Sequence, residues 1–334
     1  MLLFKLIELL ALFFFAFTLS IFFLAISRKL SLKHNLFIRD RNIPYIGGVS
    51  FSLVFIICLI LFSFIKAKVV PFQFIWIITF SFILLLVEWI DDLKDLKLKA
   101  RVLIQIIFVF LFLLYGKQIQ IYFLPNWANY LISFLWIVGI TNAFNHLDVA
   151  DGLCAGIALI VSLACLVIAL KTGSFLLFVF VALFGVLLAF LLFNFPPAKI
   201  FMGNAGSHFL GFLFATLSIY GDYASFDNIL AIFLPLLVLG LPIVDTFYLI
   251  VVRASKKISP LRKSDDHIIL RYLLKGYSYK RSLASIYFLT AVWCLSAILL
   301  LNGPGLWCLI FLIIAFLGTI LMIIKANVSK FSSC

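Results

Sequence analysis

Residues 175–193 read FLLFVFVALFGVLLAFLLF, an unbroken run without a single polar side chain. An α-helix of roughly 20 apolar residues is long enough to cross about 30 Å of hydrocarbon. Similar runs recur along the 334-residue chain, of which 66% is hydrophobic and only 12% charged. The sequence therefore predicts an all-α, polytopic integral membrane protein whose main solvent is lipid.

The apolar runs predict about eleven transmembrane helices. They lie near residues 3–26, 47–65, 72–90, 102–116, 128–145, 152–170, 175–193, 205–220, 229–252, 282–301 and 306–324. The first run is too long for the apolar core of a signal peptide and has no small-residue cleavage site after it, so we expect it to stay as a helix. No period of 20 to 50 residues repeats, which favours one domain over residues 1–334.

The distribution of Lys and Arg predicts the orientation, because short loops rich in these residues stay in the cytoplasm. If residues 27–46 are cytoplasmic, alternation places five further segments on the same side, namely 91–101, 146–151, 194–204, 253–281 and the C-terminal tail. These segments hold 21 of the 26 Lys and Arg residues. We therefore expect the N-terminus outside and the C-terminus inside. The net charge of +13 then reflects topology and anionic lipid headgroups, and we expect no nucleic-acid partner.

Ten of the thirteen acidic residues fall on or near the predicted cytoplasmic side. One group closes the third run, where Glu88, Asp91, Asp92 and Asp95 share one helical face. Carboxylates at a helix mouth can hold a divalent cation or act as a base on a phosphate. A merely solvated helix end is the alternative, although acids there oppose the helix dipole. The following Lys97, Lys99 and Arg101 either pair with phosphates or anchor the helix by charge.

A second polar group closes the fifth run, in steps of three residues that form a single stripe: Asn142, Asn145, Asp148 and Asp151, followed by Gly152. Their oxygens can bind Mg²⁺ or a nucleotide, whereas a structural stripe requires partners on a neighbouring helix.

Two further segments contain residues that could bind a ligand or take part in catalysis. The turn from Gly203 to Ser207 opens a helix and predicts either an anion site or a tight helix contact. The cytoplasmic loop at residues 253–281 holds nine Lys and Arg residues, typical of a solvated basic loop. Within it, His267 is the candidate proton donor or phosphate ligand. For the intramembrane Asp245 we favour a structural role.

Taken in order, the motifs D-D, N-x-x-N-x-x-D-x-x-D-G, F-M-G-x-x-G-S, P-x-x-D-T and a late histidine span about residues 28–281. This set resembles the polyprenyl-phosphate N-acetylhexosamine-1-phosphate transferases of glycosyltransferase family 4. The family includes initiators of O-antigen, common-antigen and teichoic-acid linkage synthesis and is related to the phospho-MurNAc-pentapeptide translocase. Eleven spans are more similar to the initiators than to the ten-span translocase.

The resemblance implies transfer of a sugar-1-phosphate from a UDP-N-acetylhexosamine to undecaprenyl phosphate in the bacterial inner membrane, with release of UMP. It implies Mg²⁺ as cofactor, with Mn²⁺ as an alternative ion. The implied partners are the UDP-sugar, undecaprenyl phosphate and membrane lipid, and a homodimer is left open.

The resemblance also implies roles for residues at matching positions. Catalysis would fall to Asp91, Asp92 and His267, with Asp91 as the base on the lipid phosphate. Metal ligands would be Asp92, Asn145 and Asn204. Substrate binding would fall to Lys99, Arg101, Asn142, Asp148, Asp151, Gly152 and Arg271. The pair Gly47-Gly48 matches the family's double glycine before the second span.

Three positions depart from the family pattern. Asn204 stands where the family usually has a metal-binding Asp, the H-x-H-H motif is reduced to His267, and Val149 stands where glycine is common. The first two departures leave open a catalytically impaired homologue that binds only lipid or nucleotide. A polytopic transporter is a further alternative. Ionisable residues near the midplane of the membrane would favour it, and only Asp245 approaches that description.

Overall fold

The computed structural model describes residues 2–65, 71–72, 74–94, 96–221, 223, 228–257, 266–303 and 305–327. It divides the chain into two compact units, an N-terminal unit (Met1–Asp222) and a C-terminal unit (Tyr223–Cys334). Each unit is helical, and the described residues form only two strands of two residues each. The predicted all-α class is confirmed, whereas the single domain stays a prediction.

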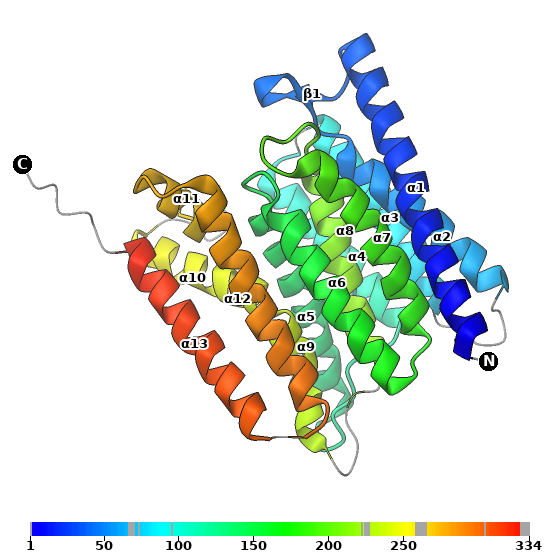
Figure 1. Ribbon diagram of the computed structural model, residues 1–334, viewed down its shortest axis with the longest axis vertical. Helices are drawn as coiled ribbons and strands as arrows, with labels where there is room; N and C mark the ends of the chain where they lie inside the picture. Colours follow the sequence, from blue (N-terminus) through cyan, green and yellow to red (C-terminus); the bar gives the residue numbers. More distant parts are fainter. Residues whose placement is uncertain are drawn as a thin grey trace, which may run out of the picture. The chain divides into compact units, whose positions relative to one another are not determined.

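The N-terminal unit begins with the long helix α1 (Leu2–His34), which is followed by a small antiparallel hairpin of β1 (Ile38–Arg39) and β2 (Ile43–Pro44) (Figure 1). Seven helices follow. They are α2 (Gly47–Ile65), α3 (Phe74–Lys94), α4 (Leu98–Tyr115), α5 (Asn126–Leu147), α6 (Leu153–Thr172), α7 (Leu176–Asn194) and α8 (Gly203–Tyr220).

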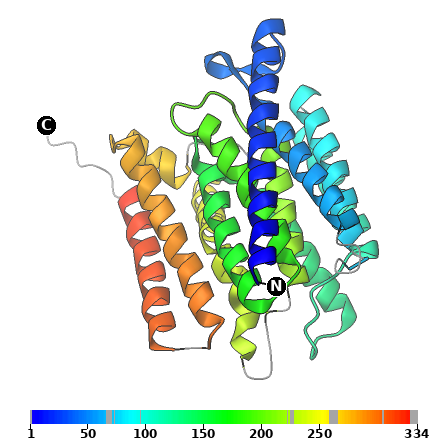
Figure 2. The ribbon, with the colours of Figure 1, turned by 45° about the vertical axis from the view of Figure 1, so that its right-hand side comes forward.

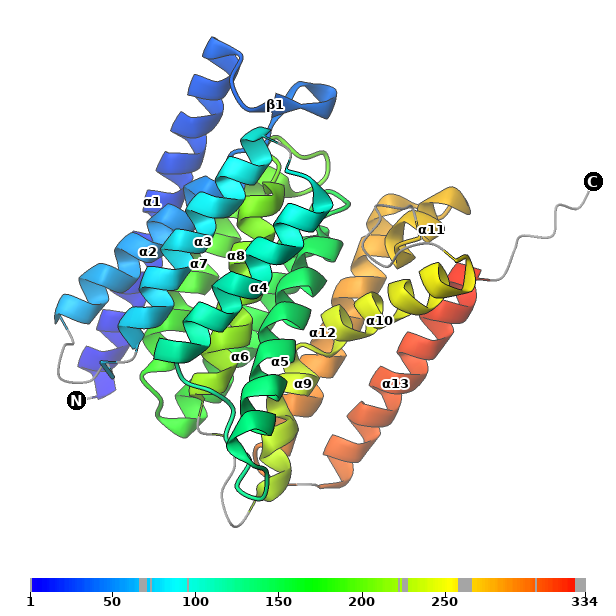
Figure 3. The same cartoon turned by 180° about the vertical axis from the view of Figure 1, so that it is seen from behind.

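Helix α8 forms the centre of this unit. It packs against α2, α3 and α5 (Figure 3). Its side chains are buried along most of its length. Helix α1 lies at the edge, against α7 and α2 (Figure 2). Because α3 and α5 end where α8 begins, polar residues at these helix termini meet at one end of the unit.

Two glycines allow α2 to approach α8 closely. A Cβ atom at Gly48 would clash with the backbone of Gly206, and one at Gly206 would clash with Gly48. At the same place, the N–H groups of Gly47 and Gly48 donate to the carbonyls of Phe201 and Met202, at 3.1 and 2.9 Å. The double glycine therefore fixes the turn that precedes α8.

Gly48→Ala should lower the melting temperature of the purified protein. The added methyl meets backbone rather than a movable side chain, and such overpacking costs about 1–3 kcal/mol. Gly139→Ala in α5 is the matched control, because a Cβ there meets nothing within 4 Å. Equal melting temperatures for the parent, Gly48→Ala and Gly139→Ala would contradict the close approach of α2 to α8.

The C-terminal unit contains η2 (Ile229–Phe233), α9 (Leu234–Val238), α10 (Gly240–Ser255), α11 (Ile268–Leu274), α12 (Tyr279–Leu300) and α13 (Leu306–Asn327). Helix α12 packs against α9, α10, α11 and α13. The segments Ile229–Val238 and Gly240–Ser255 together pass for one apolar span, but they are bent by 64° at their junction.

Nine helices among the described residues are long and apolar enough to cross a membrane, or ten if the bent pair is one span. If the bent pair is one span, ten of the eleven predicted runs coincide with a candidate span; the chain is in either case a multi-pass membrane protein. The exception is the run at 205–220, because α8 carries Asn204, Ser207 and His208 in its first turns. Large apolar side chains such as Phe14, Phe22 and Leu321 are exposed, as expected of surfaces that face lipid.

The predicted orientation can be tested by thiol labelling in intact cells. Cys334, which lies outside the described residues, should be cytoplasmic because the basic segments stay inside. A variant that keeps only this cysteine should react with a membrane-impermeant reagent after lysis but not before. Labelling without lysis would reverse the orientation and move the candidate site to the outer face.

Candidate active site

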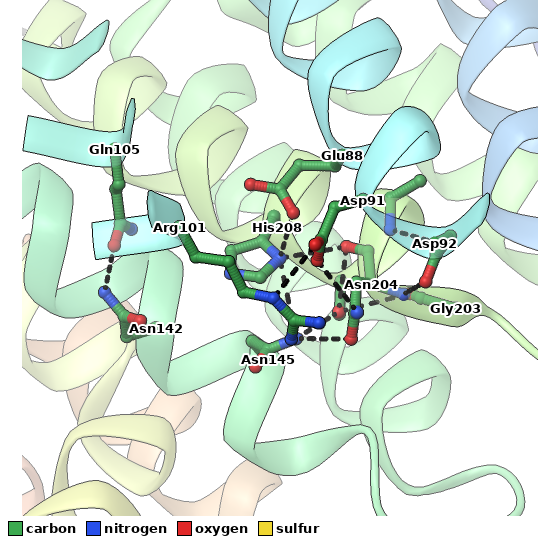
Figure 4. Close-up of polar contacts among 12 residues, drawn as sticks. Glu88, Asp91, Asp92, Arg101, Gln105, Asn142, Asn145, Gly203, Asn204 and His208 are labelled. Atoms are coloured by element: carbon green, nitrogen blue, oxygen red, sulfur yellow. Dashed lines mark hydrogen bonds and ion pairs between the residues drawn. The ribbon is translucent and has the colours of Figure 1, made fainter. Parts of the chain in front are cut away.

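The two aspartates at the end of α3 face the start of α8 and are almost completely buried. Asp91 and Asp92 are 3% and 5% exposed, which is unusual for carboxylates unless they have polar partners. Figure 4 shows Asp91 directed at α4 and α8, and Asp92 directed at the start of α8. The predicted acidic face is therefore present from Glu88 to Asp92, and Asp95 lies outside the described residues.

Asp91 is held by three groups. One carboxylate oxygen, Oδ1, lies 2.9 Å from the Nε of Arg101 and accepts the N–H of Leu96 at 2.9 Å. The other, Oδ2, accepts the side-chain amide of Asn204 at 3.4 Å. Arg101 thus balances the charge of Asp91, and the structure brings these two residues together, whereas their catalytic and substrate-binding roles stay predictions.

Asp92 caps the N-terminus of α8. Its oxygens accept the backbone N–H groups of Asn204 at 3.2 Å and Ala205 at 3.0 Å. A carboxylate at this end of a helix satisfies free N–H groups and is favoured by the helix dipole. Asp92 therefore sets the position of Asn204 beside Asp91.

Asn145, near the end of α5, completes the group. Its side-chain amide donates to the Oδ1 of Asn204 at 3.3 Å and to the Oγ of Ser207 at 3.2 Å. Asp91, Asn204 and Asn145 thus form a continuous chain of polar contacts across three helices (Figure 4).

Asn142 lies one turn before Asn145 but has different partners. Its amide donates to the Oε1 of Gln105 at 3.0 Å and to the carbonyl of Val138 at 2.8 Å. The predicted stripe is therefore present, and its first member joins α5 to α4. Lys99 lies exposed on the first turn of α4.

The remaining members of the stripe fall in the turn between α5 and α6. Asp148 is half-buried at the C-cap of α5. Asp151 receives two hydrogen bonds from Arg41, at 2.7 and 3.1 Å, and one from the backbone of Ala198 at 3.0 Å. In this structure Asp151 joins the β1–β2 region to the segment before α8, and its predicted substrate contact stays a prediction.

Gly152 has a backbone φ of 77°, which favours glycine at this position. Its N–H donates to the side chain of Asn194 at 3.0 Å. Val149 does not adopt a positive φ, so the turn accommodates a β-branched residue where the family often has glycine.

In the C-terminal unit, His267 stands at the N-cap of α11 and is buried. Its Nδ1 lies 3.8 Å from a carboxylate oxygen of Asp245. Arg271 pairs with Asp266 at 2.9 Å and also contacts Asn327. His267 is thus the partner of the predicted intramembrane Asp245, and the structural role of Asp245 stays a prediction.

One pair was missed by the sequence reasoning. The Nδ1 of His208 on α8 lies 3.1 Å from the Oε2 of Glu88 on α3 and 3.1 Å from the carbonyl of Asn204 (Figure 4). The available signal is an ionisable residue inside an apolar run, which is a functional candidate by default. In the hydropathy pattern His208 falls within the eighth apolar run, so the pattern alone does not single it out.

The residues of the α3–α8 group suit a hard divalent cation. Asp91, Asp92, Asn145 and Asn204 present carboxylate and amide oxygens, the donors that Mg²⁺ prefers. The partners described above leave further lone pairs on these oxygens. Among the described residues, no group of three or more His, Cys, Asp or Glu side chains could hold a metal ion, so a metal here would require the amide oxygens of Asn145 or Asn204.

Comparisons with known proteins agree with the motifs. Residues 74–222 match the profile of glycosyl transferase family 4. The chain is 35% identical to the probable undecaprenyl-phosphate N-acetylglucosaminyl 1-phosphate transferase of Bacillus subtilis strain 168 over 259 residues, which cover 75% of this chain and 71% of that protein.

Two other relatives match over shorter regions. The phospho-N-acetylmuramoyl-pentapeptide-transferase of Streptococcus sanguinis is 42% identical over 109 residues, 31% of this chain and 33% of its own length. The decaprenyl-phosphate N-acetylglucosaminephosphotransferase of Mycolicibacterium smegmatis is 34% identical over 179 residues, 48% and 44% of the two chains. The extent of the Bacillus match, the ordered motifs and the multi-pass helical fold show that the chain belongs to glycosyl transferase family 4, the family of polyprenyl-phosphate hexosamine-1-phosphate transferases.

Proposed function

We propose that this protein transfers N-acetylhexosamine-1-phosphate from a UDP-sugar to undecaprenyl phosphate at the cytoplasmic face of a bacterial inner membrane. The observation that carries the proposal is the buried group in which Asp91 contacts both Arg101 and Asn204. A carboxylate, a guanidinium and amide oxygens at a membrane-protein helix end suit a reaction between two phosphate-bearing substrates.

In the proposed reaction, an oxygen of the lipid phosphate forms a bond to the β-phosphorus of the UDP-sugar. The bond between that phosphorus and the bridging oxygen breaks, and UMP leaves with the electron pair. Asp91 accepts any proton that the lipid phosphate carries, and its pairing with Arg101 holds it in place. Arg101 also presents positive charge to the phosphates.

Catalysis of phosphoryl transfer rests on positioning and charge neutralisation. A bound Mg²⁺ would supply neutralisation of the pyrophosphate charge. Asp92, Asn145 and Asn204 are the residues that would hold it, because they meet at the start of α8.

One assay tests the proposal. Purified protein would be mixed with undecaprenyl phosphate, Mg²⁺ and a panel of UDP-sugars, and UMP release would be measured. We expect release with a UDP-N-acetylhexosamine and not with UDP-glucose. The absence of UMP release with every UDP-sugar would overturn the proposal.

A second candidate function is favoured by a specific contact. The amide of Asn204 satisfies Asp91 without any cation, which suits a homologue that binds lipid or nucleotide but does not catalyse transfer. Such a protein would retain undecaprenyl phosphate or a UDP-sugar in a binding experiment and release no UMP.

A further inference from the structure

Glu88 and His208 form a buried polar pair between α3 and α8. Glu88 lies one helical turn before Asp92 on α3, and His208 lies one turn after Asn204 on α8. Their side chains are only 13% and 12% exposed. Burying an ionisable pair costs free energy, so this pair is a candidate for a functional or positioning role.

The imidazole of His208 has a defined orientation. Its two closest partners, Glu88 Oε2 and the carbonyl of Asn204, are both acceptors at 3.1 Å. Nδ1 therefore carries a hydrogen and donates it. The amide nitrogen of Asn145 also lies 3.5 Å from Nδ1, but it is itself a donor, and its hydrogen bonds go to Asn204 and Ser207.

The pair forms a second contact between α3 and α8, one helical turn away from the contact that Asp92 makes with the start of α8. Asp92 accepts the N–H groups of Asn204 and Ala205, and Glu88 accepts from His208 on the same two helices. Two directional contacts on successive turns fix both the register and the rotation of α8 against α3. Buried polar pairs are best attested in this registry role.

We propose that Glu88 and His208 are positioning residues for the transfer reaction, which hold Asn204 and Asn145 in place against Asp91. This inference rests on the proposed function for its kinetic consequence. The pair need not touch a substrate. Its loss would allow α8 to rotate, and misplacement of catalytic groups by about 1 Å can lower a rate by about 10²-fold.

Three variants of His208 separate positioning from direct contact with a substrate. Asparagine places an N–H near the position of Nδ1, glutamine places one near Nε2, and leucine removes both. We expect His208→Leu to lower kcat at least tenfold with little change in KM for the UDP-sugar, and His208→Asn to retain most of the kcat. Thr216→Val is the matched control on the same helix, since the Thr216 hydroxyl donates to carbonyls of α8.

A stability measurement keeps the inference testable if no transferase activity is found. In a double-mutant cycle, Glu88→Gln and His208→Leu should each lower the melting temperature, by about 5–10 °C for the loss of one partner of a buried pair. The double variant should lose less than the sum of the two. Parental kcat in His208→Leu, additive melting shifts, or activity in His208→Gln but not in His208→Asn would each overturn the positioning role.

Discussion

Asp91→Asn should reduce UMP release by at least about 10²-fold, the usual effect of removing a general base. Asparagine has nearly the same size as aspartate, and its carbonyl can still accept the N–H of Leu96. What it lacks is the charge that pairs with Arg101 and the ability to accept a proton. The variant should therefore bind substrates with similar KM and fold, while its kcat falls.

The measurement is a steady-state assay of UMP release with saturating undecaprenyl phosphate, together with a melting curve for the same preparation. Asp95→Asn is the comparison, because Asp95 belongs to the same acidic run but follows Asp91 by four residues in the sequence. We expect it to retain most of the activity. Near-parental kcat in Asp91→Asn would remove Asp91 from the mechanism.

Local sequence pattern predicted the parts of the site that lie on a single element. The spacing of Glu88, Asp91 and Asp92 placed them on one helical face, and all three contact the first turns of α8. The turn at Gly203 was recognised in the same way, whereas the double glycine at 47–48 was recognised only through the family resemblance. Each of these signals depends on residues a few positions apart.

Contacts between distant residues were not predictable in this way. Asp151 pairs with Arg41, 110 residues away, and Asp92 caps a helix that begins only at Gly203. The periodicity of one helix shows which of its faces is polar but not which helix covers that face. Only the family resemblance indicated that Asn145 and Asn204 belong together.

A second prediction concerns the contact between Asn204 and Asp91 and its response to Mg²⁺. In this protein the Nδ2 of Asn204 donates to Asp91 at 3.4 Å, so the site is satisfied without a cation. Asn204→Asp replaces that donor with a carboxylate oxygen. Two carboxylates at this distance repel each other unless a cation lies between them. In EDTA the variant should therefore melt several degrees below the parent.

Added Mg²⁺ should reverse this effect. Hard cations bind anionic oxygen more tightly than a neutral amide, and a ligand that binds only the folded state raises its stability. We expect Asn204→Asp to need about tenfold less Mg²⁺ for half-maximal UMP release, which corresponds to about 1.4 kcal/mol of added binding energy. Its melting temperature should also rise more steeply with Mg²⁺ than that of the parent.

The exchanged variant, Asp91→Asn with Asn204→Asp, is the control that separates charge from position. It restores one carboxylate and one amide at the same contact, and the amide introduced at position 91 can donate to the carboxylate introduced at position 204. In EDTA its melting temperature should therefore return toward that of the parent. Its turnover should stay low, because the base is no longer at position 91.

A parent that releases no UMP at any Mg²⁺ concentration would instead support the impaired homologue, and Asn204→Asp would then either gain activity or stay inactive. If the parent is active and Asn204→Asp changes neither the Mg²⁺ requirement nor the Mg²⁺ dependence of melting, residue 204 does not ligate the metal, and the metal must be held by other oxygens.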